Sequence, residues 1–117
     1  MLGFNEYRRL SQPSRRLITL TMSTTDRIMY TCPNGKSCRI DSIVVVNTAS
    51  GNTTFNMHHC GPGETASTTN ALYYEQSMSA KATLIDDSPK YLTSGETIVV
   101  KASSTPHITM TVYGVES

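Results

Sequence analysis

The chain has 117 residues, which is the size of one domain, and a formal net charge of only +1. Ten Lys and Arg side chains nearly balance nine Asp and Glu side chains, which excludes a strongly basic nucleic-acid-binding protein and a highly charged disordered chain. Ser and Thr fill 31 of the 117 positions, with 17 Thr and 14 Ser. Because Thr is β-branched and suits a half-exposed pleated surface, the composition favours strands over helices.

The sequence shows no apolar stretch of the kind that directs secretion or crosses a membrane. The first ten residues, MLGFNEYRRL, lack a signal-peptide core, and no segment approaches the roughly 18 apolar residues of a membrane span. We therefore expect a soluble protein that is made in a cytoplasm and has no membrane partner. The three cysteines agree, because an odd number makes a poor disulfide framework and cytosolic thiols usually stay reduced.

Residues 1–16 are predicted to form an arm attached to the domain. Residues 1–27 contain five Arg against one Glu and one Asp, a balance of +3, whereas the other 90 residues carry five basic and seven acidic groups, a balance of −2. We predict that the arm docks on a partner protein; a solvated tail, packing on its own subunit and nucleic-acid contact are the alternatives. The expected contact residues are aromatic, apolar or basic: Leu2, Phe4, Tyr7, Arg8, Arg9, Arg15 and Arg16.

From Leu17 onward, apolar residues recur with a period of two, which is typical of β-strands. Strands are predicted over 17–22 and 28–32. Asn34-Gly35 then predicts a tight hairpin turn, because both residues adopt positive φ at low cost. The next strand, 38–46, ends in an apolar run and is expected to lie centrally in a sheet.

The second half of the chain continues as short strands separated by turns. Residues 53–60 alternate and end at Gly61-Pro62-Gly63, interpreted as a turn because no helix follows that would bind phosphate. Asp86-Asp87 is interpreted as a solvated turn and not as a calcium site. The later strands are expected at 72–74, 80–85, 90–92, 97–101 and 107–113. Residues 17–117 are therefore predicted to form a single all-β domain, an antiparallel β-sandwich that is jelly-roll-like, with about eight short strands.

The cysteines and histidines carry the chemistry for a metal site. Cys32, Cys38, His58 and Cys60 are weak candidate zinc ligands, since their spacing contains no close Cys-x2-Cys pair. A Cys32–Cys38 disulfide is an alternative that requires the loop to place the two side chains opposite each other, and an intracellular origin argues against it.

Two catalytic hypotheses use the same region. Cys60 as a nucleophile with His58 or His59 as its base is disfavoured, because neighbouring side chains on a strand diverge. A metal-dependent enzyme of cupin-like fold that uses His58, His59 and a carboxylate is the other alternative. We predict no catalytic residue, no metal and no cofactor, and therefore a protein that is not an enzyme.

Four segments of the chain resemble small β-sandwich virion proteins of tailed bacteriophages. In those proteins, a hairpin with Pro-x-Gly, an apolar strand that ends in Asn, a Leu-x-x-Gly-Asp/Glu-x-Ile turn and a terminal Gly-x-Glu recur. The matching segments are YTCPNGK at 30–36, IVVVNT at 43–48, LTSGETI at 92–98 and VYGVE at 112–116. The resemblance covers residues 27–116 and does not include the cysteine and histidine positions 32, 38 and 58–60.

Within this class, the resemblance implies a capsid decoration (cement) protein. Such proteins are non-enzymatic and commonly trimeric, and they bind the outer capsid shell where capsomers meet. The expected partners are the major capsid protein and further copies of this chain, with no nucleic acid and no membrane. We expect a chain that is made in the host cytoplasm and located on the capsid exterior. The alternative is a tail-, neck- or fibre-associated virion protein that contacts host glycans through Tyr73 and Tyr74.

Overall fold

The computed structural model of the protein describes residues 13–104 and 107–117, which form nine β-strands and one short 3-10 helix. No helix among these residues is long and apolar enough to span a membrane. The elements are β1 Arg15–Thr21, β2 Arg27–Thr31, β3 Cys38–Asn47, β4 Thr53–Cys60, η1 Thr68–Asn70, β5 Ala71–Met78, β6 Thr83–Asp86, β7 Lys90–Leu92, β8 Thr97–Ala102 and β9 Ile108–Glu116.

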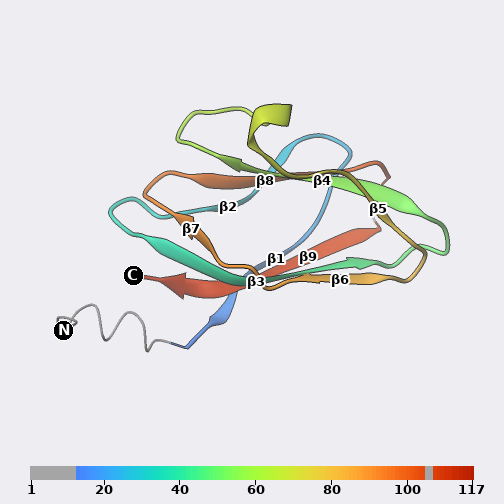
Figure 1. Ribbon diagram of the computed structural model, residues 1–117, viewed down its shortest axis with the longest axis horizontal. Coiled ribbons are helices and arrows are strands. Elements are labelled where there is room, and N and C mark those ends of the chain that lie inside the picture. Colours follow the sequence, from blue (N-terminus) through green and yellow to red (C-terminus); the bar gives the residue numbers. More distant parts are fainter. Residues whose placement is uncertain (1–12, 105–106) are drawn as a thin grey trace.

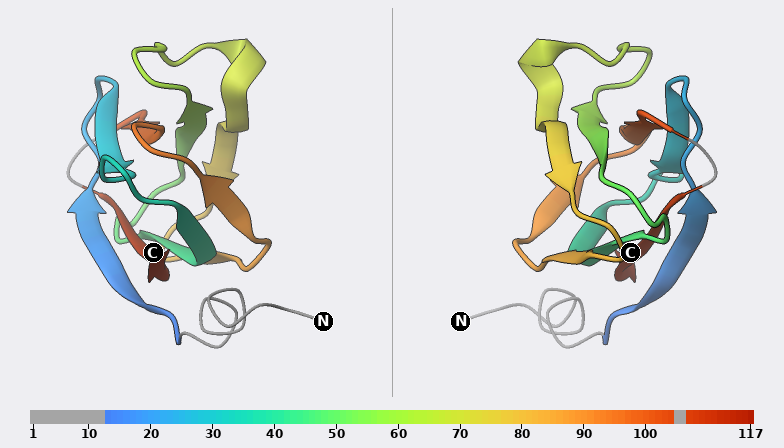
Figure 2. Two further views of the ribbon diagram at one scale, coloured as in Figure 1. Left: turned by 90° about the vertical axis from the view of Figure 1, so that its left-hand side faces the viewer. Right: turned by 90° about the vertical axis from the view of Figure 1, so that its right-hand side faces the viewer.

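The strands form two antiparallel sheets that face each other, as Figures 1 and 2 show. Sheet A has the order β1-β9-β3-β6, with β7 also paired to β3, and sheet B has the order β2-β8-β4-β5. The predicted all-β sandwich is therefore confirmed. The central position predicted for 38–46 is confirmed as well, because β3 lies between β9 and the β6–β7 edge.

The core between the sheets follows the period of two. Ile108, Met110 and Val112 of β9 are fully buried, as are Ile43 and Val45 of β3. These positions alternate with residues that face away from the core. Apolar residues at alternate positions therefore hold the two sheets together by burial.

The turn predicted at Asn34-Gly35 is present, but the prediction that its flanking strands form a hairpin is wrong. Gly35 has φ +78°, and the amide of Lys36 donates to the carbonyl of Pro33. However, β2 pairs with β8 in sheet B, whereas β3 pairs with β9, β6 and β7 in sheet A. The segment links the two sheets because strands with one apolar face gain more by covering opposite sides of a core than by pairing locally.

The turn predicted at 86–89 does not reverse the chain. Both β6 and β7 pair antiparallel with β3, through Ile43↔Asp86 and Ile40↔Lys90. They therefore run in the same direction and form one interrupted edge strand.

Gly114 occupies a place that no other residue fits. It pairs with Ile40 where β3 bulges between Ile40 and Ser42. A Cβ on residue 114 would lie 2.0 Å from the carbonyl oxygen of Arg39, which is backbone and has no rotamer to change. Glycine at this position therefore allows β9 to pack against the bulged strand.

Candidate docking surface

The outer face of sheet A is built from alternate residues of its strands. Cys38 and Ile40 of β3 point inward and are buried, so Arg39 between them points outward. Tyr91 on β7 and Val115 on β9 are its register partners and lie on the same face. Basic, aromatic and aliphatic groups therefore stand side by side at this end of the sheet.

Two rows of uncharged residues also lie on that face. Two rows cross the four neighbouring strands, Ile85–Val44–Thr111–Thr19 and Thr83–Val46–Thr109–Thr21. The hydroxyl oxygens of Thr19 and Thr111 lie 3.2 Å apart. We call the two rows, together with Arg39, Tyr91, Tyr113 and Val115, the sheet A face.

Large apolar side chains on the sheet A face are open to solvent. Tyr91 is 68% exposed and Ile85 is 65% exposed, and Tyr113 is also exposed. Exposed aromatic and aliphatic groups beside rows of uncharged residues are typical of the centre of a protein–protein interface. The sheet A face is therefore our candidate docking surface.

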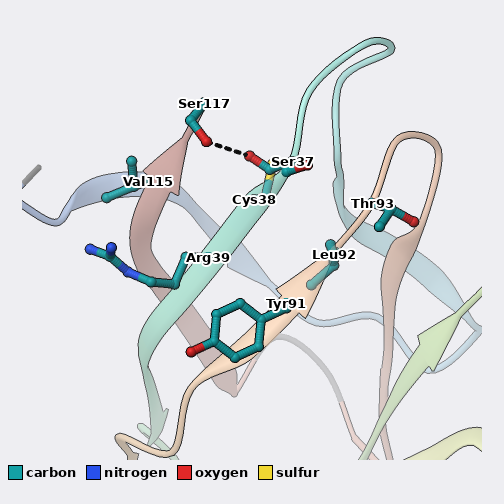
Figure 3. A pocket seen from close by; sticks show the side chains of 8 residues that line it. All are labelled: Ser37, Cys38, Arg39, Tyr91, Leu92, Thr93, Val115 and Ser117. Carbon is teal, nitrogen blue, oxygen red and sulfur yellow. Dashed lines mark hydrogen bonds between the residues drawn. The ribbon is translucent and has the colours of Figure 1, made fainter. Parts of the chain in front are cut away.

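A pocket of about 370 Å³ opens at the end of this surface (Figure 3). Figure 3 shows Arg39, Tyr91 and Val115 around it, from three neighbouring strands. Paired backbone hydrogen bonds between Ser37 and Ser117, of 3.0 and 2.9 Å, close one side. The lining residues are Ser37, Cys38, Arg39, Tyr91, Leu92, Thr93, Val115 and Ser117.

The predicted arm meets the domain at the edge of sheet A. Arg15 and Arg16 belong to β1 and pair with β9, so the first strand begins two residues before the predicted domain start at 17. Arg15 Nη2 lies 3.2 Å from Glu116 Oε1, and Arg16 is exposed. The other predicted arm contacts lie outside the described residues, and their docking stays a prediction: Leu2, Phe4, Tyr7, Arg8 and Arg9.

A polar cluster marks the place where the chain joins β1. The Ser14 hydroxyl donates to the Asp41 carboxylate, and Arg39 Nε lies 2.6 Å from Asp41 Oδ1. The Arg39 guanidinium, together with Ser14, holds the pKa of Asp41 below its usual range. This contact fixes Ser14 beside the candidate docking surface.

Part of the outer face of sheet B is covered by the chain itself, whereas Ile28 of β2 stays exposed. Segment 61–70 lies outside this sheet, on the side away from sheet A (Figure 1). Asn70 holds the segment: its Oδ1 accepts from the Ser67 amide and lies 2.9 Å from His58 Nδ1, and its Nδ2 donates to Glu64 Oε1 and to the carbonyl of Thr65. His58, Val99 and Cys60 are consequently buried on the outward side of sheet B.

A bulge beside this cover turns an aromatic ring to solvent. Tyr74 and Glu75 of β5 lie opposite the single residue Asn56 of β4, and Glu75 has φ +49°. The Glu75 amide donates to Asn56 Oδ1 at 2.7 Å, and Tyr74 is 53% exposed. Two hollows of about 270 and 200 Å³ share Asn56, Tyr74 and Lys101, and we call them together the Tyr74 groove.

The structure separates the candidate zinc ligands into two places. Cys32 and Cys38 lie at one end of the core, with their Sγ atoms 2.8 Å apart, whereas His58 and Cys60 lie beneath segment 61–70. No group of three or more His, Cys, Asp or Glu side chains within the described ranges has the geometry to hold a metal ion.

The nucleophile and base that the sequence offered are also apart. Cys60 is buried, which raises the pKa of its thiol, and His58 Nδ1 pairs with Asn70. The buried Nε2 of His59 has Glu96 Oε1 at 3.4 Å, too loosely placed for a hydrogen bond. These contacts give His58 a structural partner and leave Cys60 without a base.

Several elements of these sites were not visible in the sequence. Tyr74 was named only as a glycan contact together with Tyr73, but Tyr73 points inward and donates to Asp86 Oδ2 at 2.8 Å. A bulge shifts the strand register by one residue, and no local motif marks it. The bonds of Asn70 join residues from 58 to 70, and no motif in the sequence marks them.

Comparison of the chain with known protein families, with curated proteins and with solved structures finds no match. We therefore infer the function from the surfaces described above and from the motifs in the sequence.

Proposed function

We propose that this chain is a structural virion protein that binds the outer surface of a bacteriophage capsid and cements neighbouring major capsid subunits. The observation that carries the proposal is the sheet A face, with its two uncharged rows and exposed Ile85 and Tyr91, located on the sheet from whose edge the predicted arm departs. Interface centres are depleted of charge and enriched in aromatic residues. Arm and face together would give one continuous binding surface.

The strand order supports an assignment to the jelly-roll architecture within the β-sandwich class. When β6 and β7 count as one interrupted strand, each sheet has four strands, and consecutive strands β1 to β5 alternate between the sheets until β4 and β5 pair. Jelly rolls of two Greek keys occur in viral capsid domains and in lectins. Fold does not determine function, so the architecture supports the proposal only together with the sheet A face.

Repetition explains how such a protein would strengthen a shell. A modest interface that is repeated over many capsid subunits gives a large total stabilisation, because each bound copy raises the effective concentration of its neighbours' contacts. Within the described residues, the strands β1 and β2 are paired on one side only. Association into a trimer would cover such edges, which otherwise invite aggregation.

Binding to capsids tests the proposal directly. Purified chain should co-sediment with expanded capsids that lack it, in hundreds of copies per particle, and should raise their disruption temperature. A chain without residues 1–12 should lose most of this binding while β1 to β9 remain folded. If full chain and truncated chain bind equally well, the arm has no part in docking; if neither binds, the decoration role is wrong.

The Tyr74 groove favours a second candidate function, that of a tail-, neck- or fibre-associated protein that binds host saccharides. Lys101 and Glu75 have no hydrogen-bonded side-chain partner within the described residues, and both border the exposed ring of Tyr74. An aromatic platform with polar groups of both charge signs suits a neutral, hydroxyl-rich ligand. Copy number separates the two roles: densitometry of virions should give a dozen copies or fewer for a tail component.

A further inference from the structure

Two thiols face each other at the end of the core, beside the pocket. Cys32 follows β2 of sheet B, Cys38 begins β3 of sheet A, and both are free and buried. Their Sγ atoms lie 2.8 Å apart, and a disulfide bond measures about 2.05 Å. A displacement of less than about 1 Å therefore brings the two sulfurs to bonding distance.

The surroundings keep the two thiols in this arrangement. The Tyr30 hydroxyl donates to Glu116 and lies 3.2 Å from Cys38 Sγ, so the Cys38 thiol donates to the tyrosine oxygen. Cys32 Sγ lies 3.4 Å from the carbonyl oxygen of Lys36 and 3.6 Å from that of Leu92. Each sulfur therefore has a polar neighbour besides its partner thiol.

We propose that Cys32 and Cys38 form a modification site, at which a small-molecule disulfide such as oxidised glutathione converts the pair into a covalent link between the two sheets. The inference is independent of capsid binding, because it depends only on the two side chains and on the pocket. Cys38 lines that pocket and Cys32 does not, so the reagent reaches Cys38 first.

The reaction proceeds by two thiol–disulfide exchanges. The Cys38 thiolate attacks one sulfur of the reagent, forms a mixed disulfide and releases the first small thiolate. The Cys32 thiolate then attacks Cys38 Sγ, forms the Cys32–Cys38 bond and releases the second small thiolate. The two protein thiols together lose two protons and two electrons, and the reagent is reduced to two thiols.

Burial makes the second exchange slow at neutral pH. Burial, with the neighbouring Cys38, raises the pKa of Cys32 to about 12, so few molecules carry the attacking thiolate near pH 7. The rate of closure should therefore rise by about tenfold per pH unit between roughly pH 7 and 9. Once formed, the link restricts the unfolded chain, and the melting temperature should rise by about 5–10 °C.

The test compares the reduced full-length chain before and after incubation with oxidised glutathione. Thiol titration of the denatured product should fall from three groups to one, and the intact mass should decrease by two hydrogens. Trypsin cleaves after Arg27, Lys36 and Arg39, so the link should join the peptides 28–36 and 37–39. Reduction should reverse the change in mass and in melting temperature.

Variants separate the proposed pair from the third thiol. Cys60→Ala should still lose both remaining thiols, whereas Cys32→Ala and Cys38→Ala should show no gain in melting temperature on oxidation. Because either alanine variant of the pair can fail to fold, Cys60→Ala by itself suffices for the thiol count. Retention of all three thiols in the wild-type chain, a lasting glutathione adduct on Cys38, or a link to Cys60 would each overturn the proposal.

Discussion

The outer faces of the two sheets differ in how they meet solvent. Segment 61–70 covers part of the outer face of sheet B, and Asn70 holds this segment with bonds to His58, Glu64, Thr65 and Ser67. Ile28 and Tyr74 on the same sheet stay exposed. The sheet A face has no such cover within the described ranges, and Ile85 and Tyr91 on it are exposed. The chain thus covers part of one outer surface by itself and leaves the other without such a segment within the described residues, which favours the sheet A face as the surface for a partner.

The largest expected effect comes from charge on the open face. The double substitution Ile85→Asp and Tyr91→Asp should weaken capsid binding by about 100-fold or more, since two unpaired carboxylates would be desolvated in the interface. Both side chains are exposed, so the melting temperature should change little. Tyr74→Asp, on the opposite side of the molecule, is the matched control and should bind normally. Equal losses for both would mean that the two faces do not differ in function.

Removal of the cover on sheet B should have the next largest effect. Asn70→Ala deletes the amide that holds segment 61–70 and should cost about 2 kcal/mol of unfolding free energy, measured in urea. Cys60 beneath the segment should then react faster with a thiol reagent. Asn52→Ala, which removes one exposed bond to the Ala80 amide, should cost about 0.5 kcal/mol or less. An unchanged Cys60 rate would show that Asn70 does not hold the cover in place.

Acid should weaken the contacts of Asp86, which joins β6 of sheet A to Tyr73 of sheet B. Although burial raises the pKa of Asp86, the hydrogen bonds from Lys90, Ser88 and Tyr73 hold it well below its usual range. Its contribution to stability is therefore complete above about pH 4, the value for the unfolded chain, and is lost as the pH falls towards the folded pKa. Thermal unfolding between about pH 5 and 2 measures this loss.

Two variants test whether Asp86 causes this acid dependence. Asp86→Asn removes the titrating carboxylate and should flatten the pH profile below about pH 4, at the cost of lower stability at neutral pH. Asp87→Asn, at the exposed neighbouring position, should leave the profile unchanged. A profile that stays equally steep in Asp86→Asn would place the acid sensitivity in another carboxylate.

The smallest effect is expected on the threonine rows of the sheet A face. Thr109→Val keeps the shape of the side chain and removes an exposed hydroxyl contact of 3.4 Å to Thr21, so the unfolding free energy should change by less than about 0.5 kcal/mol. Thr53→Val is the contrasting control. The Thr53 hydroxyl is buried and lies 2.7 Å from Ser103 Oγ. Its removal should lower the unfolding free energy by about 1–2 kcal/mol. Similar losses of unfolding free energy at both positions would contradict the expected difference between exposed and buried hydroxyl groups.

The sequence did not show which strands pair with each other, as the region around Asn34-Gly35 illustrates. The local turn is present, because positive φ at Gly35 is a property of the residue itself. The partners of the flanking strands are distant: β8 for β2, and β9, β6 and β7 for β3. The turn residues predicted at 86–89 likewise left open that β6 and β7 run in the same direction along β3.

In the candidate sites, too, the sequence named single residues but not the contacts between distant segments. Arg15 and Arg16 were predicted as contact residues of the arm, which stays a prediction, and Cys32 and Cys38 were named as candidates from residue type. The contact of 2.8 Å between the two thiols was only one of several open alternatives, because it depends on how β2 and β3 cross between the sheets. The exposure of Tyr74 in place of Tyr73 depends on a bulge that no residue type announces.

The amino-acid sequence by itself determined the all-β class, most strand positions and the inward set on β9, because side-chain alternation and turn propensity act over a few residues. Only the tertiary structure decided which strands pair, which outer face is covered and which thiols meet. Those outcomes depend on contacts between segments far apart in the chain, where burial of apolar area over the whole sandwich outweighs any local preference.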